Sequence, residues 1–310
     1  MEGNGQPEDS KRVILIAGPT ASGKSTLALE LAKTLDGVII NADSMQLYEE
    51  LRVVSARPSV EEEAQVPHRL YGVLSASTAF STGAWLRLAT AEIESVWSVG
   101  KVPILVGGTG LYFKALSEGF ADLPEIPDEI RDKARSLADQ EGVAGLKRQL
   151  ENLGDERASH NLSDPQRLAR ALEVLMATGE SLSHWQSRPH PAPFLANGQA
   201  TQIVLAPPRP WLHERIARRA HLMLSEKGIE EVKNLLSKGL STKLPAMRAI
   251  GVNEIGAFLN DENDIGETAY RLTVATRQYA KRQETWFRNQ MSDWQRVDPS
   301  EEFDIRTLLD

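Results

Sequence analysis

The sequence predicts an α/β fold in which a parallel sheet is flanked by helices and an all-helical domain is inserted. Three observations support this fold class. Short, continuously apolar segments such as residues 13–17 (VILIA) suit strands that are buried on both faces. Segments with helical periodicity alternate with them, as is typical of a parallel sheet. From about Pro124 the chain is punctuated by proline and then strongly helical, with no candidate strand before residue 201.

The composition predicts a soluble globular protein. Of its 310 residues, 41% are hydrophobic and 25% are charged, and no apolar run approaches the roughly 18 residues that a membrane span needs. Residues 1–10 hold acidic but no basic side chains, unlike a signal or transit peptide, so we expect a short flexible tail, a cytoplasmic protein and no membrane partner. The absence of cysteine excludes disulfides, thiolate zinc sites and a cysteine nucleophile.

The charge distribution limits the class of partner. A net charge of −8 argues against indiscriminate nucleic-acid binding, which usually rests on a positive surface. Basic residues are nevertheless clustered at 209–219 and 271–288. A local basic surface is therefore still compatible with the sequence.

The expected elements follow one another in order. The strand at 13–17 leads through a glycine loop into a helix at 25–35, where leucine recurs every four residues. "GVIINADS" and "KVPILVGGTG" predict two more strands, which end in Asp43 and Ser44, and in Gly107, Gly108 and Thr109. The helix expected between them, at 83–99, has an inward face of Trp85, Leu88 or Ala89, Ile93, Val96 and Trp97. Ligands of such sheets bind outside the carboxyl ends of the strands, so we expect all three strand ends to face one site.

The helical insertion divides the predicted core into two parts. The core comprises residues 1–121 and 191–310, and the insertion comprises residues 122–190. Prolines and a glycine in 187–198 suit a linker that returns to the core. Beyond it we expect a strand at 202–206 and then mainly helices, including a long one at 267–289.

The stretch "GPTASGKST" at residues 18–26 has the Gly-x-x-x-x-Gly-Lys-Ser/Thr pattern of a P-loop. Its glycines let backbone N–H groups turn toward a phosphate, Lys24 supplies a positive charge, and the following helix points its positive end at the anion. Ser25 is placed to bind Mg²⁺, the cofactor that we expect. We therefore predict a P-loop NTPase-like core with a diphosphate or nucleotide site formed by Gly18, Pro19, Thr20, Ala21, Ser22, Gly23, Lys24 and Ser25.

The acid near this loop has several interpretations. A P-loop normally binds ATP or GTP, and nucleotide hydrolysis normally uses an aspartate at the end of a second strand. Here "ILVGG" ends in glycines and Thr109, which leaves Asp43 as the acid at a strand end. From spacing alone, Asp43 is equally a metal ligand, a helix cap or a base for an incoming nucleophile. By themselves, these residues favour kinase-like phosphoryl transfer.

Eight blocks in chain order resemble the bacterial-type tRNA dimethylallyltransferases, also called tRNA isopentenyltransferases. They cover nearly the whole chain: "LIAGPTASGKS", "NADSMQLY", "ARPS", "VPHRLYGV", "PILVGGTGLYFKAL", "DPQRLARALEVLMATG", "MRAIGVNEI" and "ATRQYAKRQETWFR". The resemblance implies transfer of the dimethylallyl group from dimethylallyl diphosphate to N6 of the adenine 3′ to the anticodon, in tRNAs that read codons beginning with U. Diphosphate would be released. The partners would be this donor and the anticodon stem-loop of tRNA, and the enzyme would act as a monomer.

The resemblance also assigns roles to residues near the loop. Lys24, Asp43 and Thr109 match catalytic positions: Lys24 would stabilise the departing diphosphate, and Asp43 would accept a proton from the attacking amine. Without the resemblance, Thr109 is also well explained as a helix cap. Arg215 and Arg219 match arginines that reach the donor diphosphate, although a salt-bridged helix is the plain alternative.

The residues that the resemblance assigns to tRNA contact fall in several blocks. They are Asp43, Ser44, Met45, Gln46 and Thr109; Arg131; Gln166, Arg167, Leu168, Ala169 and Arg170; and Arg248, Ala249, Ile250, Gly251, Val252 and Asn253. Helical periodicity alone turns Leu168, Leu172 and Leu175 toward the core of the insertion. It also places Arg277, Lys281 and Arg288 on one stripe suited to a phosphate backbone, opposite Leu272, Tyr279 and Trp286, which we expect to pack inside.

Three departures from the family pattern fall in RNA-contact blocks. Arg57 replaces the lysine of "GTAKP", Tyr71 and Gly72 stand where an aspartate is common after "PHRL", and Val252-Asn253 replaces the end of "IGYR". Their effect on RNA contacts, the set of tRNAs served and any later modification do not follow from the sequence. The alternatives are a nucleoside or nucleotide kinase, an enzyme that prenylates free adenosine phosphates, and a non-catalytic RNA-binding module. The last would leave Lys24, Ser25 and Asp43 unexplained.

Overall fold

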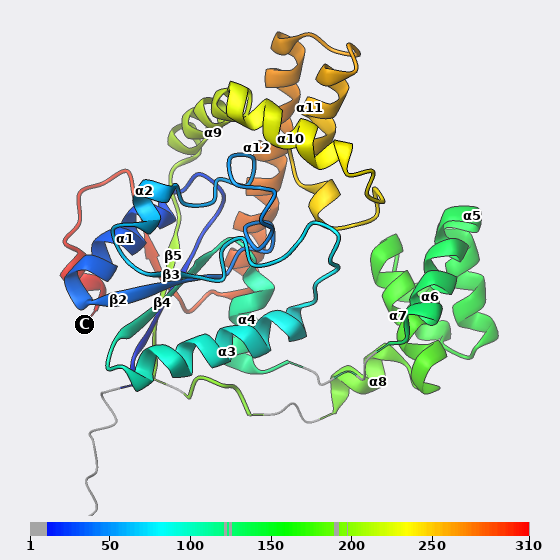
Figure 1. The fold of residues 1–310 in the computed structure, drawn as a ribbon. Helices are drawn as coiled ribbons and strands as arrows, with labels where there is room; N and C mark the ends of the chain where they lie inside the picture. The colour runs from blue at the N-terminus through cyan, green and yellow to red at the C-terminus, as the bar shows by residue number, and fades with distance from the viewer. Residues whose placement is uncertain (1–10, 121–122, 124–125, 189–191, 197, 310) are drawn as a thin grey trace, which may run out of the picture. The chain divides into compact units, whose positions relative to one another are not determined.

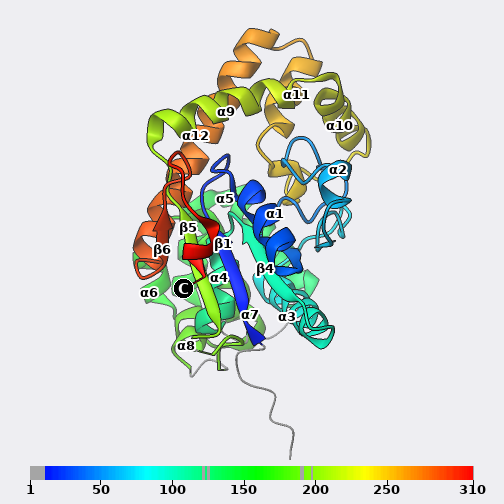
Figure 2. The same ribbon diagram turned by 90° about the vertical axis from the view of Figure 1, so that its left-hand side faces the viewer.

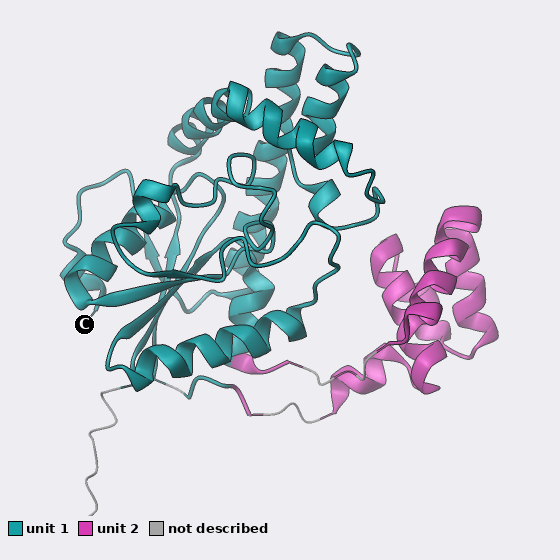
Figure 3. Ribbon diagram, viewed as in Figure 1, with its two compact units in different colours: residues 1–117, 194–310 teal, residues 118–193 magenta. Residues whose placement is uncertain are grey.

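The computed structural model describes residues 11–120, 123, 126–188, 192–196 and 198–309. The chain forms two compact units, shown in separate colours in Figure 3: unit 1 is Met1–Ser117 with Phe194–Asp310, and unit 2 is Glu118–Pro193. The expected tail at 1–10 and the expected insertion boundaries at 122 and 190 lie outside the described residues.

Unit 1 contains a six-stranded parallel sheet (Figure 1). Its strands are β1 (Val13–Ala17), β2 (Gly37–Asn41), β3 (His68–Arg69), β4 (Val102–Gly107), β5 (Ala200–Leu205) and β6 (Gln295–Val297), in the spatial order β3-β2-β4-β1-β5-β6. The α/β fold class and the four longer strands are confirmed. The two short strands, β3 and β6, have no apolar run that sequence reasoning could detect.

Helices cover both faces of the sheet because side chains alternate between the faces along each strand. Val13 and Leu15 of β1 join the core formed with α3 (Thr82–Ser98) and α4 (Gly110–Glu118). Ile14 and Ile16 join the opposite core, formed with α1 (Lys24–Leu35) and η3 (Ile305–Leu308). The predicted inward face of α3 is confirmed for Trp85, Ala89, Ile93 and Val96, whereas Leu88 is exposed.

The helices that build a third apolar core lie beyond the end of the sheet that carries the P-loop (Figure 2). It is built by α9 (Arg209–Met223), α10 (Glu226–Ser237), η2 (Ala246–Arg248), α11 (Val252–Leu259) and the first half of α12 (Ile265–Gln290). The chain between β2 and β3, which includes α2 (Val60–Glu63), contributes Leu51 and Val54. The second half of α12 packs on the sheet through Phe287, so this helix links two cores.

Unit 2 is all-helical over its described residues. Its helices are α5 (Asp128–Asn152), α6 (Glu156–Asn161), α7 (Pro165–Thr178) and α8 (Leu182–Ser187). The side chain of Asp164 caps α7 by accepting the N–H of Arg167, and α7 stops at Gly179, whose φ of 74° lies in the left-handed region. The core includes Leu146, Leu150, Leu168 and Leu172. None of the helices in the described residues is long and apolar enough to cross a membrane.

Candidate active site

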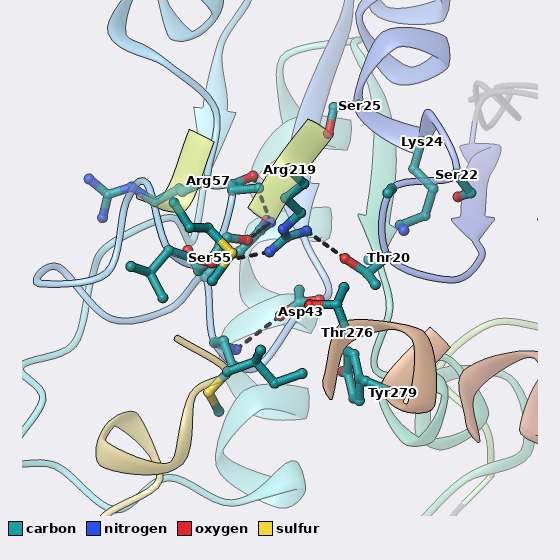
Figure 4. Close-up of a pocket in the computed structure, with 18 of the residues that line it drawn as sticks. Thr20, Ser22, Lys24, Ser25, Asp43, Ser55, Arg57, Arg219, Thr276 and Tyr279 are labelled. Atoms are coloured by element: carbon teal, nitrogen blue, oxygen red, sulfur yellow. Dashed lines mark hydrogen bonds between the residues drawn. The ribbon is translucent and has the colours of Figure 1, made fainter. Parts of the chain in front are cut away.

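A cavity of about 780 Å³ in unit 1 lies where three strand ends meet. It is lined by residues 20–26 after β1, residues 43–46 after β2, and Val106 and Gly107 at the end of β4. α9 and α12 close it from other directions, as Figure 4 shows for Arg219 and Tyr279. The structure therefore brings the predicted strand ends to one site, as expected for a parallel α/β sheet.

The P-loop is shaped by its glycines and by the start of α1. Gly23 has a φ of 92°, a left-handed conformation that other residues rarely adopt, and α1 begins at the next residue. The first N–H groups of α1 therefore lie beside the cavity that Gly23, Lys24 and Ser25 line. Within the described residues, the buried hydroxyl of Ser22 has no hydrogen-bond partner. The loop thus carries donors for an anion.

Lys24 is a partly buried cation whose ammonium group is hydrogen-bonded to its own loop. Its Nζ donates a hydrogen bond to the carbonyl of Pro19 at 2.7 Å. Burial lowers the pKa of Lys24 to about 8; the Asp43 carboxylate opposes this change and the Arg219 guanidinium adds to it. An anion bound in the cavity would favour the charged form of Lys24.

Two arginines of α9 lie directly on the P-loop. Arg215 Nε donates to the carbonyl of Ala21 at 2.8 Å, while Arg219 donates to the hydroxyl of Thr20 and, at 3.1 Å, to the carbonyl of Val54. Burial lowers the pKa of Arg219, partly offset by Asp43. The Nε of Arg219 is buried and has no partner among the described residues. Both arginines line the cavity, and their contact with a donor diphosphate stays a prediction.

Asp43 is oriented by its neighbours at the end of β2. The buried side chain of Asn41 accepts the Asp43 N–H at 2.8 Å and donates to the Asp43 carbonyl at 3.0 Å. Asp43 Oδ1 accepts the N–H of Met45 at 3.0 Å, which fixes the rotamer of the carboxylate. The other oxygen, Oδ2, lies beside Gly108, where a Cβ would come within 3.1 Å of it.

Thr109 connects the ends of β4 and β2. Its Oγ1 accepts the N–H of Ser44 at 3.0 Å, and its own N–H donates to the carbonyl of Ala42 at 3.2 Å. Thr109 also precedes α4, at the position where a cap would stand, yet this hydroxyl is used across the strand ends. Thr109 is not among the residues that line the cavity, and its hydroxyl contacts Ser44, the residue next to Asp43; its catalytic role stays a prediction.

The remaining residues predicted for tRNA contact separate into two sets in unit 1. Ser44, Met45, Gln46, Arg248, Ala249 and Ile250 line the cavity, whereas Gly251, Val252 and Asn253 do not. Val252 is buried in the core between the C-terminal helices, and Asn253 is exposed. Gln46 donates to the carbonyls of Ser55 and Ala56, so its amide holds the wall of the cavity.

The predicted tRNA contacts of unit 2 differ in exposure. Gln166 and Arg167 are exposed, and Arg170 forms an ion pair with Glu173 at 3.1 Å. Arg131 pairs with Asp128 at 3.2 Å, and Ala169 is partly buried. The side chain of Leu168 is fully buried, because the helical register that turns Arg167 outward turns Leu168 into the core, so its predicted contact with tRNA would be limited to its backbone.

Several lining residues were not predicted from the sequence. The cavity wall has seven basic side chains and two acidic ones, and the unpredicted basic residues are Arg57, Arg218 and Arg282. Tyr279 and Thr276 of α12 also line it (Figure 4), which corrects the expectation that Tyr279 packs inside the protein. Burial, with the nearby Asp43 charge, raises the pKa of the Tyr279 hydroxyl, which therefore stays protonated at neutral pH. The excess of cations makes the cavity suited to an anionic ligand.

Two of the departures from the family pattern lie against each other. A Cβ built on Gly72 would come within 1.8 Å of Arg57 Nη1, and Gly72 has a left-handed φ of 60°. The Arg57 guanidinium therefore occupies the space that a side chain at position 72 would need. Arg57 Nη1 also donates to the carbonyl of Tyr48 at 3.3 Å. The longer side chain at position 57 and the missing one at position 72 are sterically complementary.

Comparison with known proteins gives one consistent result. The IPP transferase family model matches residues 46–290. The chain belongs to the IPP transferase family. A tRNA dimethylallyltransferase of Rhizobium johnstonii is 50% identical over 92% of this chain and 96% of its own length. One from Parvibaculum lavamentivorans is 48% identical over 91% of this chain and 90% of its own length.

Solved structures agree with the IPP transferase assignment. A tRNA isopentenylpyrophosphate transferase of Bacillus halodurans superposes with a TM-score of 0.68 at 32% identity, over 96% of this chain and 93% of its own. A eukaryotic dimethylallyltransferase acting on tRNA gives a TM-score of 0.76 at 25% identity, over 93% of this chain and 74% of its own. The recognition of the family from the sequence blocks is confirmed, and the kinase alternative finds no support among these IPP transferase relatives.

Proposed function

We propose that this protein is a tRNA dimethylallyltransferase, which transfers the five-carbon group of dimethylallyl diphosphate to N6 of the adenine 3′ to the anticodon and releases diphosphate. The tRNAs would be those that read codons beginning with U. The observation that carries the proposal is one cavity in which a cationic P-loop faces a single oriented aspartate. The activity named for the relatives at 48–50% identity supports the same reaction.

Stabilisation of the leaving group is the first task of the site. The allylic carbon becomes positive as diphosphate departs, so the negative charge that develops on the diphosphate needs fixed partners. Lys24 and Arg219 supply positive charge, and the N–H groups at the start of α1 supply donors. The lowered pKa of Lys24 supports this role, because a poorly solvated ammonium gains the most from an incoming anion.

Mg²⁺ fits the same end of the cavity. Mg²⁺ in phosphate sites usually takes one or two protein ligands, keeps several waters and binds the substrate's phosphate oxygens. Ser25 lines the cavity next to Lys24 and has the hydroxyl that P-loops use for this purpose. When bound, the ion would neutralise charge on the diphosphate. Ser25 would hold it, while Lys24 and the α1 N–H groups bind the remaining oxygens.

Asp43 is the residue that we assign to activation of the acceptor substrate, the N6 amine of adenine. An exocyclic amine is a weak nucleophile, and loss of its proton to a neighbouring carboxylate during attack lowers the barrier. Asp43 Oδ1 is already engaged by the Met45 N–H, so Oδ2 is the oxygen that would receive the proton. Thr109 orients this turn through Ser44. Asp43 and Thr109 would therefore act on the amine, whereas Lys24 would act on the diphosphate of the donor.

The target adenine has to leave the anticodon stack to reach Asp43, as in other enzymes that act on a base. The exposed Gln166 and Arg167 of unit 2 and the exposed Arg277, Lys281 and Arg288 of α12 are suited to hold the RNA outside the cavity. Direct contact of these side chains with tRNA is part of the proposal. Action as a monomer and a cytoplasmic location stay predictions.

A single assay tests the function. Purified protein is incubated with Mg²⁺, dimethylallyl diphosphate labelled in the prenyl group and unmodified total tRNA, and the tRNA is then digested to nucleosides. We expect label in N6-substituted adenosine. Fully modified tRNA is the matched control and should accept no label. Label in no nucleoside, together with phosphoryl transfer from ATP to a nucleoside or nucleotide, would replace the proposal with the kinase alternative.

A further inference from the structure

Gln283 of α12 joins two segments that the proposed reaction uses separately. Its Oε1 accepts the N–H of Thr20 in the P-loop at 2.8 Å. Its Nε2 donates to the carbonyl of Gly108 at 2.9 Å, in the turn that carries Thr109. These partners are 263 and 175 residues away along the chain. One side-chain amide therefore links the loop expected to hold the donor to the turn beside the acceptor.

The side chain of Gln283 is almost fully buried and closely packed. Gln283 is 5% exposed, and it lies where a Cβ on Gly108 would come within 2.3 Å of Nε2. The same Cβ would come within 3.1 Å of Asp43 Oδ2, so Gly108 separates Gln283 from the catalytic carboxylate by one small residue. Thr20 is held on its other side by Arg219, which donates to the Thr20 hydroxyl. A displacement of Gln283 would thus shift both the P-loop and the turn beside Asp43.

We propose that Gln283 is a positioning residue, which sets the separation between the diphosphate held by the P-loop and the amine held at Asp43. The inference rests on the proposed function, since it assigns the distance between the two substrates of that reaction. The Gln283 amide presents an acceptor to Thr20 and a donor to Gly108 from one planar group at every pH. Leucine has neither, and an ionised glutamate would oppose the Gly108 carbonyl with a second acceptor.

The effect should appear in turnover more than in donor binding. Each segment keeps its own binding groups without Gln283: Lys24 and Arg219 remain on the P-loop, and the Asn41 and Met45 contacts remain at Asp43. What changes is their relative placement. Misplacement of reacting groups by about 1 Å can lower the rate about 100-fold. We therefore expect Gln283→Leu to lower kcat by about this factor, with a much smaller change in KM for dimethylallyl diphosphate.

Gln283→Glu provides a second readout that a general loss of packing would not produce. When protonated, the introduced carboxyl can accept from Thr20 and donate to Gly108, as the amide does. Burial and the Asp43 charge favour the protonated form, while Arg219 favours the ionised one. We expect the ratio of variant to wild-type kcat to rise as the pH is lowered from 9 to 6. Gln278→Glu, at an exposed position of the same helix, is the matched control and should show a constant ratio.

Steady-state kinetics of the full-length variants with dimethylallyl diphosphate and tRNA, with folding checked by circular dichroism, test the inference. A wild-type kcat in Gln283→Leu, or a defect confined to KM for the donor, would overturn it. If Gln283→Leu does not fold, the Gln283→Glu profile decides, and a ratio that is flat with pH overturns the inference. An inactive wild-type protein would instead refute the proposed function, so the two failures are distinguishable.

Discussion

Replacement of Lys24 by methionine should make the unliganded protein more stable while removing donor binding. The folded protein lowers the pKa of Lys24 from 10.5 to about 8 because the ammonium is buried. At about 1.36 kcal/mol per pH unit, this difference means that charged Lys24 costs about 3 kcal/mol of folding free energy at pH 7. Loss of the hydrogen bond to Pro19 lowers the stability of the variant by about 1 kcal/mol, which offsets part of this gain. We therefore expect Lys24→Met to be about 2 kcal/mol more stable than the wild type.

The stability gain should depend on pH with a definite sign. Below pH 8, Lys24 is charged in both the folded and the unfolded state, so the wild type carries the whole penalty. Between pH 8 and 10.5 the folded state loses the proton and the unfolded state keeps it, so wild-type stability rises with pH. The advantage of Lys24→Met is therefore largest below pH 8 and disappears toward pH 10.5.

Thermal unfolding without ligand measures this gain. With about 2.1 cal/mol/K of unfolding entropy per residue, 2 kcal/mol corresponds to a rise in Tm of about 3 °C. The control is Lys33→Met, because Lys33 is an exposed lysine on the same helix and should change Tm very little. Diphosphate with Mg²⁺ should raise the Tm of the wild type and not that of Lys24→Met. An equal or lower Tm for Lys24→Met at pH 7, or a gain that persists unchanged at pH 10, would refute the reasoning.

Three further changes address other parts of the protein. Asp43→Ala should abolish prenyl transfer while diphosphate binding persists in calorimetry; continued turnover would remove the proton-accepting role. Gly72→Ala should lower the free energy of urea unfolding by about 1–2 kcal/mol, because its backbone is left-handed and its Cβ meets Arg57. Arg57→Lys in the same chain should recover part of that loss, and an equal loss in both backgrounds would contradict the steric pairing. Arg277→Ala should reduce the slope of log Kd for tRNA against log salt by about 0.7–0.9; an unchanged slope would exclude Arg277 from the RNA interface.

The sequence predicted the parts of the fold that depend on local patterns. Apolar runs located β1, β2, β4 and β5, because strands buried on both faces need continuous apolar residues. β3 consists of His68 and Arg69, and it joins the sheet through backbone groups that have no side-chain signal. The strand ends were predicted to converge because that follows from parallel topology rather than from any one residue.

The site was harder to predict where long-range contacts define it. Helical periodicity identified the inner stripe of α12 that contains Tyr279, but the inner side of a helix faces a cavity as readily as a core. Gln283 gave no signal because its partners are backbone groups of Thr20 and Gly108, distant in sequence. The sequence showed Arg57 and Gly72 as separate departures from the family pattern. It could not show their contact, which depends on the left-handed turn at Gly72.

The long sequence separation between the P-loop and α12 has a consequence for how the site forms during synthesis. The helix supplies Thr276 and Tyr279 to a cavity that residues 20–26 also line, and the hydrogen bond between Gln283 and Thr20 joins the helix to this loop. A growing polypeptide can therefore assemble β1 to β5 and still lack a finished site until residues 276–283 have left the ribosome. Shortened versions that stop before α12 would be expected to bind phosphate weakly and to transfer nothing.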